Sequence, residues 1–381
     1  MSDQNNSLPL SKLGAMLDRT QKGTNTRAFH GLNRQNALMT LAGAAILILL
    51  LFRIQNVIAE AGYSADTWVR FVFSGLIIGG MYALVAIGYT LVYGILSMIN
   101  FAHGDVMMLG SFGGYFVLVA CQNISVGMGT LLNTYPILSL LAAFLVGMGI
   151  SALMGFLLEK IAYRPLRNAS RLAPLISAIG ASTFIEVATQ LMFGVQRREY
   201  PNPDLLTRGA GWTVMVGGNP VVLTYTGVFS LALSFILMVA LYLFVQHTRL
   251  GKAMRAVSQD RNTAALMGID VNKTISQAFI LSGVLAGAAG VMWGVHNGLI
   301  NYYLGFLPGS KAFTAAVLGG IGNIPGAMLG GMFLGMIESV GPAALGIDFQ
   351  LKDVLAFSIL ILVLIFRPSG LLGEALSKEK V

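Results

Sequence analysis

The sequence predicts an all-α polytopic membrane protein with about nine membrane segments, and three observations lead to this prediction. Hydrophobic residues make up 55% of the chain and charged residues 10%, whereas an ordinary soluble domain carries about 25% charged residues. So few charges cannot cover the surface of a soluble globule of this size. The apolar stretches are continuous rather than alternating, which disfavours a β-barrel. Glycine is abundant, at 46 residues, as in membrane helices that pack closely.

The first 36 residues are polar, and the first long apolar stretch begins near Ala37. We interpret 1–36 as an uncleaved cytoplasmic tail, because a secretory signal would place its apolar core earlier. A bilayer core needs roughly 20 apolar residues per helix. By this criterion the predicted spans cover 37–58, 69–93, 95–120, 137–158, 172–194, 226–246, 275–298 and 352–367.

The stretch 311–342 differs from the other apolar segments because it is too long for one span. It is interrupted by Gly319, Gly320, Gly322, Pro325 and Gly326. Proline and clustered glycines break a helix, and irregular backbone at membrane depth is stable only inside protein or facing water. The pattern predicts either two short crossings or a re-entrant hairpin.

The loop charges predict the orientation. Basic residues gather in alternate short loops, which is the positive-inside pattern rather than a nucleic-acid-binding surface. The loop 195–225 is expected on the periplasmic side, where it can form a small docking surface. The segments expected in the cytoplasm are 1–36, 159–171, 246–274 and 372–381. This orientation requires that 311–342 turns back or crosses twice.

Polar residues within the apolar segments are candidates for a translocation path, because ionisable groups are costly in hydrocarbon. Asn100, His103 and Asp105 open the third predicted span, where they either cap the helix start or contact a transported molecule. Glu186 lies in mid-span and either braces two helices by hydrogen bonds or lines a path. Glu338 and His296 lie nearer span ends and are expected at the interface.

The broken stretch supplies the second candidate wall of that path. Its candidate residues are Gly319, Gly320, Gly322 and Asn323. An interrupted helix exposes backbone N–H and C=O groups at membrane depth, and helix N-termini favour a carboxylate. We expect the glycines to let this stretch approach 100–105 closely.

The loop 246–274 contains a predicted amphipathic helix over 250–268. Leu250, Met254 and Val257 share one face, and Lys252 and Arg255 share another. Such a helix between two spans either presses against the membrane surface or inserts into a partner protein.

Several classes of site are not predicted. The sequence has no Gly-x-x-x-x-Gly-Lys-Ser/Thr loop, no His-Glu-x-x-His and no Gly-x-Ser-x-Gly. Its four histidines are far apart, and Cys121 is the single cysteine. We therefore expect no metal site, no cofactor, no disulfide within the chain and no catalytic constellation.

Three motifs together resemble a known family. They are GLIIGGMYALVAIGYTLVYG at 75–94 with MINFAHGD at 98–105, TRLGKAMRA at 248–256 with QDR at 259–261 and ALMGI at 265–269, and AVLGGIGNIPGA at 316–327. They resemble the inner-membrane permease of branched-chain amino acid ABC importers, of the LivH-like type. The resemblance covers roughly 70–370, so the chain divides into an additional N-terminal region (1–68), a permease domain (69–371) and a short tail (372–381).

The resemblance implies a complex with ABC ATPase subunits, a second permease chain of the companion type and a periplasmic substrate-binding protein, in contact with membrane lipid and without nucleic acid. ATP is then hydrolysed on the partner, so the chain itself is not expected to be an enzyme. The residues that the resemblance places at the ATPase are Lys252, Arg255, Asp260, Arg261, Ala265 and Gly268. Relatives with these motifs also move urea and short amides, which stay open as substrates.

An ion-coupled secondary transporter is the competing prediction from another class. Such a protein usually carries a carboxylate or another ion ligand at a broken helix. The break at 319–326 has the glycines and the proline but no carboxylate. This absence favours the ABC importer.

Overall fold

The computed structural model describes residues 52–53, 55–56, 63–127, 129–167, 169–170 and 172–373. The chain divides into two units, Met1–Asn56 and Val57–Val381, and the fold below is that of the second unit. The predicted tail 1–36, most of the predicted span 37–58 and of the N-terminal region 1–68, Arg171 and most of the tail 372–381 lie outside the described residues.

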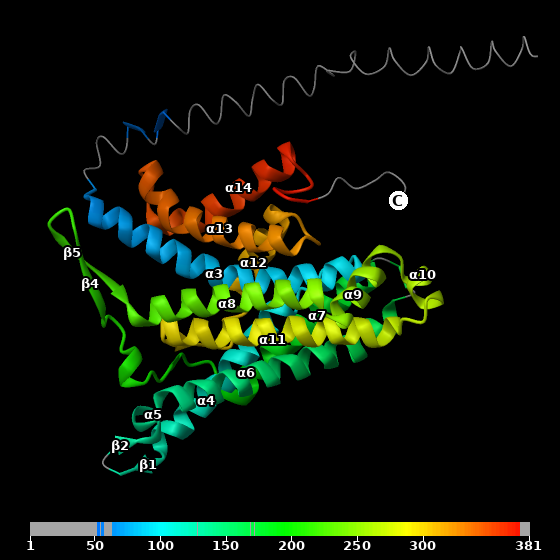
Figure 1. The fold of residues 1–381 in the computed structure, drawn as a ribbon, viewed down its shortest axis with the longest axis horizontal. Coiled ribbons are helices and arrows are strands. Elements are labelled where there is room, and N and C mark those ends of the chain that lie inside the picture. Colours follow the sequence, from blue (N-terminus) through cyan, green and yellow to red (C-terminus); the bar gives the residue numbers. More distant parts are fainter. Residues whose placement is uncertain are drawn as a thin grey trace, which may run out of the picture. The chain divides into compact units, whose positions relative to one another are not determined.

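The described residues form long helices, as the sequence predicts (Figure 1). The long helices are α3 (Ala65–Leu96), α4 (His103–Asn123), α6 (Pro136–Leu157), α7 (Leu172–Phe193), α8 (Tyr225–His247), α11 (Val271–Asn297), α13 (Ile324–Leu345) and α14 (Lys352–Phe366). Counted with their short helical extensions, eight helices among the described residues are long and apolar enough to cross a membrane. The 14-residue helix α12 (Phe306–Gly319) is shorter than these.

Shorter elements join the long helices. The short helices are α5 (Leu131–Thr134), α9 (Arg249–Gln259), α10 (Arg261–Leu266), the π-helical turn η1 (Leu158–Tyr163) and the 3₁₀ turns η2 (Arg164–Leu166), η3 (Asp204–Leu206) and η4 (Phe349–Leu351). The described strands form antiparallel pairs, namely β1 (Ser125–Val126) with β2 (Gly129–Thr130), β3 (Arg198–Glu199) with β6 (Leu299–Ile300), and β4 (Gly211–Val216) with β5 (Asn219–Thr224).

The long helices lie side by side, and the bundle has two different ends (Figure 1). The hairpin end carries β4 and β5, which pair from Gly211 with Thr224 to Val216 with Asn219. Gly217 and Gly218 connect these strands with positive φ angles of 60° and 88°, as a two-residue hairpin turn requires. The opposite end, called the α10 end below, carries α9 and α10.

Glycines bring α3 and α13 into backbone contact at the centre of the bundle. A Cβ atom placed on Gly335 would lie 2.3 Å from the Cα of Gly79, and one on Gly331 would lie 2.3 Å from the Cα of Ala83. A second contact of the same kind joins α4, α6 and α11 around Gly110 and Gly287. Close helix approach, the role expected of the abundant glycines, is thus confirmed at these positions.

The third predicted span is wrong at its start. Helix α3 ends at Leu96 because Ser97 adopts a left-handed conformation with φ 54°, and its N–H donates to the Tyr93 carbonyl. Helix α4 then begins at His103 rather than near residue 95. The His103 ring lies against Gly88 of α3, so α4 starts about two turns inward from the end of α3.

The broken stretch 311–342 folds as two antiparallel helices. Helix α12 spans about 21 Å, which is less than the roughly 30 Å of a bilayer core, whereas α13 is long enough to cross. Gly319 meets Gly326, and Gly330 meets Ala315, so the chain turns back on itself at 320–323. The segment 369–373, which follows α14, lies on this turn at the α10 end.

Candidate functional site

The start of α4 is buried in the bundle, and Asn100, His103 and Asp105 are each no more than 3% exposed. The Tyr163 hydroxyl donates to the Asn100 Oδ1 at 2.8 Å, and the Ser182 hydroxyl donates to the Asp105 Oδ2 at 2.5 Å. No side chain caps α4, so the prediction that Asn100 or Asp105 caps this helix is wrong. These residues instead connect α4 to α7 and to η1.

Two helix N-termini meet at Asp105. Gly104 at the start of α4 touches Gly305 and Gly309 at the start of α12, and a Cβ on Gly104 would lie 2.3 Å from the Gly305 carbonyl oxygen. We call this contact, formed by Gly104, Asp105, Gly305 and Gly309, the α4–α12 junction. A carboxylate is favoured near helix N-termini, so Asp105 is electrostatically matched to the junction.

Glu186 lies on α7 one turn after Ser182 and is half-buried. Residues four apart share a face of a helix, so Glu186 lies on the face of α7 from which the Ser182 hydroxyl donates to Asp105. The structure gives its carboxylate no hydrogen bond from another described residue, and the Thr183 hydroxyl donates to Ile179 of its own helix. Among the described residues Glu186 therefore does not brace two helices by hydrogen bonds, which leaves the path-lining alternative.

The glycines of the broken stretch do not approach Asn100 or Asp105. They lie at the opposite end of α12, where Gly322 is near Gly94. The prediction of close approach is therefore wrong. The last carbonyls of α12 are paired, because the Leu371 and Leu372 N–H groups donate to Leu318 and Gly319 at 2.8 and 3.0 Å, whereas Gly322 in the same turn is exposed.

Asn323 has a structural role in this turn. Its side chain caps α13 by accepting from the Gly326 N–H at 3.1 Å, and its Nδ2 donates to the Leu372 carbonyl at 2.8 Å. Gly320 and Gly322 have φ angles of 106° and 95°, which glycine adopts without strain.

The sequence prediction missed a buried ion network between α12, α13 and α14. Lys311 and Glu338 are 3% and 4% exposed, and the Lys311 Nζ lies 2.7 Å from the Glu338 Oε1 and 2.6 Å from the Asp353 Oδ1. The Tyr82 hydroxyl donates to the Glu338 Oε2 at 2.9 Å. Glu338, which was expected near a span end, is buried in this network and also contacts Lys352 at the start of α14. A lysine inside a predicted membrane segment was the signal that could have revealed this network.

A second missed network lies near the α10 end. Glu159 of η1 is fully buried and accepts from Arg164 at 3.2 Å, from Arg167 and from the Ser276 hydroxyl at 2.7 Å. Burial lowers the pKa of the Arg167 guanidinium, and the opposite charge of Glu159 raises it. This network fixes the predicted basic loop 159–171 to the start of α11.

The predicted helix 250–268 is two helices, α9 and α10, with a break at Asp260. The Asp260 side chain caps α10 by accepting from the N–H groups of Asn262 and Thr263 at 2.8 and 3.2 Å. Met254 and Val257 are buried and Lys252 and Arg255 are exposed, as the amphipathic pattern predicts.

Arg261 and Arg255 hold this loop to the bundle. The Arg261 guanidinium donates twice to the Ile95 carbonyl at the end of α3, at 2.8 and 3.2 Å, and its pKa is lowered by burial. The Arg255 guanidinium donates to the side chain and the carbonyl of Gln246. Arg261 therefore positions α10, since its guanidinium is engaged by α3.

The end of α10 forms an exposed apolar tip at residues 265–268. Leu266 is 87% and Met267 79% exposed. Gly268 has a φ angle of 84°, which lets the chain turn back toward α11 as predicted. These two side chains lie next to each other on a loop between spans and present apolar surface there.

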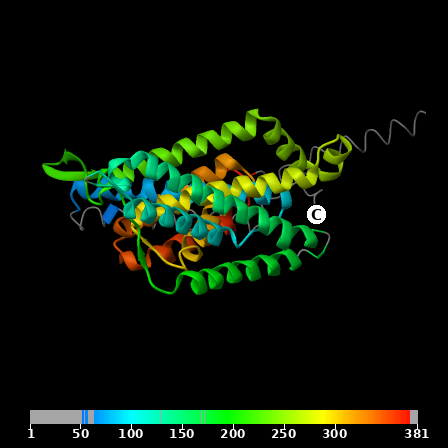
Figure 2. The ribbon, with the colours of Figure 1, turned by 90° about the horizontal axis from the view of Figure 1, so that it is seen from below.

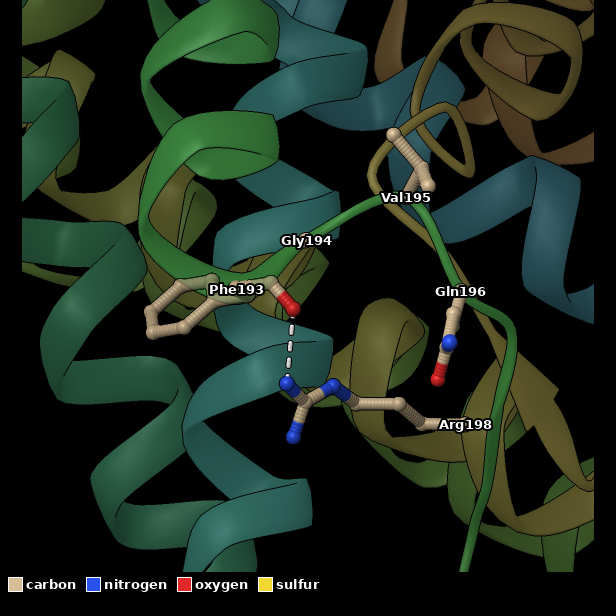
Figure 3. A pocket seen from close by; sticks show the side chains of 5 residues that line it. All are labelled: Phe193, Gly194, Val195, Gln196 and Arg198. Carbon is tan, nitrogen blue, oxygen red and sulfur yellow. Dashed lines mark hydrogen bonds between the residues drawn. The ribbon is translucent and has the colours of Figure 1, made fainter.

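Arg198 braces the loop after α7 at the hairpin end (Figure 3). Its guanidinium donates to the Phe193 carbonyl at 2.6 Å and lies over the rings of Tyr115 and Phe116. A cavity of about 470 Å³ lies beside it, lined by residues 193–196 and Arg198. Nearby, burial raises the pKa of the Tyr200 hydroxyl. These contacts stabilise the end of α7.

Residues 71–364 match the protein family described as "Branched-chain amino acid transport system / permease component". The chain belongs to this family. The permease works with an ABC ATPase and other components of an ABC importer, and it is a multi-pass protein of the inner membrane. Its described residues include the long apolar helices that such a location requires.

Several curated relatives resemble the permease over most of their length. The "high-affinity branched-chain amino acid transport system permease protein BraD" of Pseudomonas aeruginosa is 46% identical over 79% of this chain and 94% of its own length. LivH of Escherichia coli, with the same description, is 42% identical over the same shares. A probable LivH of Methanocaldococcus jannaschii is 29% identical over 83% of this chain and 96% of its own length. No solved structure matches this chain.

Proposed function

We propose that this permease imports branched-chain or chemically related amino acids, driven by ATP hydrolysis on a separate subunit. The relatives at 46% and 42% identity are named for transport of this substrate class. We further propose a second permease chain of the companion type and a periplasmic substrate-binding protein as the remaining components. In this complex the chain itself catalyses no reaction.

The observation that carries the proposal is the exposed tip 265–268 at the α10 end. Leu266 and Met267 offer an apolar surface to a partner, and the bonds from Arg261 to Ile95 connect that surface to α3. A partner that moves the tip therefore moves the end of α3, and residues 97–102 connect that end to the start of α4. This is the mechanical link that an importer needs between ATP hydrolysis and its path.

The proposed orientation puts the α10 end in the cytoplasm. The described residues of 159–171, 246–274 and 372–381 lie at this end, and the β4–β5 hairpin of 195–225 lies at the other. Basic residues concentrate at the α10 end, in agreement with the positive-inside rule. The exposed Trp212 and Met215 of the hairpin then face the periplasm, where a binding protein docks.

The proposed path passes the α4–α12 junction. Polar side chains from α4 and α7 lie near the start of α12, namely those of Asp105, Ser182 and Glu186. His103 and Asn100 line the inner side of α4 in this proposal. At the cytoplasmic end of the path, the turn between α12 and α13 acts as a hinge and not as a wall of the path. The residues of this turn are Gly319, Gly320, Gly322 and Asn323.

The test uses the chain produced together with the three proposed components, an ABC ATPase, a companion permease and a substrate-binding protein. We expect uptake of labelled L-leucine that depends on ATP. Uptake that instead follows an ion gradient in the absence of the ATPase would support a secondary transporter. Uptake of labelled urea without L-leucine would assign the chain to the urea and short-amide relatives.

Variants of the tip test the coupling step. Gly268→Val strains a residue with a φ angle of 84°, and Leu266→Asp adds a charge to the apolar tip without disturbing a buried side chain. We expect each to lower uptake about tenfold or more while the protein remains in the membrane. Gly149→Val is the control, because a Cβ at this exposed glycine of α6 meets nothing within 4 Å. Normal uptake and normal ATPase stimulation in both tip variants would refute the coupling role.

A further inference from the structure

A cavity of about 320 Å³ opens beside the buried ion network of Lys311 and Glu338. This volume lies at the lower limit of small-molecule sites, which measure roughly 300 to 1,000 Å³. The residues that line the cavity come from α3, α11, α12, α13, the segment before α12 and the start of α14, and they are Ile78, Tyr82, Trp293, Asn297, Asn301, Tyr303, Leu304, Leu307, Pro308, Lys311, Glu338 and Lys352.

The cavity presents charges of both signs in one small volume. Lys311 and Lys352 are positive, Glu338 is negative, and Asp353 lies 2.6 Å behind Lys311. The Lys352 Nζ is 3.3 Å from the Glu338 Oε1, the same oxygen that Lys311 contacts. The charges of these four side chains sum to zero. A ligand with a net charge would therefore add an unbalanced charge to the cavity, whereas a zwitterion would not.

The rest of the cavity wall consists of side-chain amides and apolar side chains. Asn297 and Asn301 provide side-chain amides, and the Asn297 Nδ2 donates to the Trp293 carbonyl at 3.2 Å. Ile78, Leu304 and Leu307 add aliphatic surface beside the indole of Trp293. The cavity thus has a charged side and an apolar side. A ligand with two opposite charges at one end and a hydrocarbon group at the other matches these two sides.

The exposures of the two lysines show which end of the cavity is open and which end is buried. The side chain of Lys352 is 45% exposed and that of Lys311 is 3% exposed. Trp293 and Asn297 belong to the last turns of α11 near the hairpin end, whereas Tyr82 lies near the middle of α3. The cavity therefore leads from the hairpin end toward the middle of the bundle.

A purely structural ion network does not require this cavity. The cavity is open at its mouth, where Lys352 is 45% and Tyr303 43% exposed, and it reaches the buried side chains of Lys311 and Glu338. A brace between α12, α13 and α14 would be complete with the bonds between Lys311, Glu338 and Asp353 alone.

We propose that this cavity binds a zwitterionic α-amino acid before it enters the path, a role that rests on the proposed function. The ligand carboxylate lies at Lys352 and Lys311, and its ammonium lies at Glu338 and the oxygens of the asparagine amides. Its aliphatic side chain packs on Trp293 and Leu307. The site supplies a selectivity step inside the permease, in addition to that of the binding protein.

Tryptophan fluorescence tests the site on the purified full-length chain in lipid nanodiscs. The chain has three tryptophans, so Trp68→Phe with Trp212→Phe leaves Trp293 as the reporter in the cavity wall. We expect a saturable change in emission with L-leucine. We expect binding weaker by about tenfold or more for 4-methylpentanoate, which lacks the ammonium, and for 3-methylbutylamine, which lacks the carboxylate.

Paired replacements remove the two most buried charges together and leave Asp353 and Lys352, whose side chains are 37% and 45% exposed. In the Trp293 reporter background, Lys311→Met with Glu338→Leu removes the ion pair as a unit, a change that proteins often tolerate. We expect unchanged thermal unfolding and a loss of the L-leucine response of about tenfold or more in affinity. Leu307→Phe, which fills the cavity, should have the same effect. Phe306→Leu is the matched control next to it and should bind normally, since Phe306 does not line the cavity.

Three results would overturn the proposal. They are the absence of an L-leucine response at Trp293, equal binding of 4-methylpentanoate, and an undiminished response in the paired variant. Uptake assays on the complete complex separate this inference from the proposed function. If wild-type uptake is intact and Leu307→Phe leaves it unchanged, the cavity proposal fails and the importer stands. If the wild-type complex imports no amino acid while Trp293 still responds to L-leucine, the proposed function fails and the site stands.

Discussion

Helices α7 and α13 have the same length of 22 residues and nearly the same hydropathy, yet they are held in different ways. α13 contacts α3 through the backbone at Gly331 and Gly335. α7 lies at the edge of the bundle, along the lower side of Figure 2. Gly180 is the single glycine of α7, and a Cβ atom placed on it would have no atom within 4 Å. Hydropathy alone therefore does not tell a central helix from a peripheral one, whereas small residues in contact do.

The attachments of α7 are few and specific. The Ser182 hydroxyl donates to Asp105, the Ser177 hydroxyl donates to the Ala162 carbonyl, and the Phe193 ring stacks on Phe112 with centroids 4.9 Å apart. One face of α7 is exposed from Leu172 to Met192. A helix attached in this way moves at lower cost than α13, which suits the gate of a transport path.

The largest effect is expected from a side chain added to the α3–α13 contact. Gly335→Val would place atoms within 2.3 Å of the Gly79 backbone, which cannot move without separating the helices. We expect a destabilisation of about 3 kcal/mol or more and little folded protein. The measurement is the yield and thermal midpoint of the detergent-purified chain.

Gly180→Val on α7 is the matched control for this change. The same substitution in a helix of the same length meets open space, so stability should change by less than about 0.5 kcal/mol. Equal losses in the two variants would show that the contrast between α13 and α7 is wrong.

A smaller effect is expected at the polar attachment of α7. Ser182→Ala removes the hydroxyl that donates to the buried Asp105, and an unsatisfied buried acceptor costs about 1–3 kcal/mol. Hydrogen exchange in α7 should accelerate, and uptake should fall. Thr183→Ala is the neighbouring control, since its hydroxyl donates only to its own helix. If hydrogen exchange in α7 is the same in both variants, Ser182 does not hold this helix.

The smallest effect on stability is expected for Glu186. Glu186→Leu removes a half-buried carboxylate that has no hydrogen-bond partner among the described residues, so the free energy of unfolding should change by less than about 0.5 kcal/mol. If Glu186 lines the path, uptake should fall severalfold while the ATPase stays bound. Gln190→Leu, one turn further along α7, serves as the control. Normal uptake in Glu186→Leu would place the path elsewhere.

Most of the helices could be predicted from the sequence because their apolar length is a local property. The predicted spans 226–246 and 275–298 agree with α8 and α11 within about four residues at each end. The split of 250–268 at Asp260 was missed, although aspartate is a favoured residue at the start of a helix, where it accepts from backbone N–H groups two and three residues later. The start of α4 was missed because a single left-handed residue, Ser97, ends α3.

The site was predicted less well because it depends on contacts between distant segments. Lys311, Glu338 and Asp353 are 15 to 42 residues apart, and no local pattern indicates that they form one network. Likewise, nothing near Gly319 indicates that residues 369–373 pair with its turn. Asp105 and Glu186 were identified as candidates because an ionisable residue in an apolar segment is visible in the sequence, but their proximity was not.

The pairing of residues 369–373 with the α12–α13 turn has a consequence for biosynthesis. The carbonyls of Leu318 and Gly319 accept from Leu371 and Leu372, which are synthesised more than fifty residues later. While the chain emerges from the ribosome, this turn therefore stays open until α13 and α14 have been inserted. A chain whose translation stops before residue 369 exposes these carbonyls and the unpaired glycine turn.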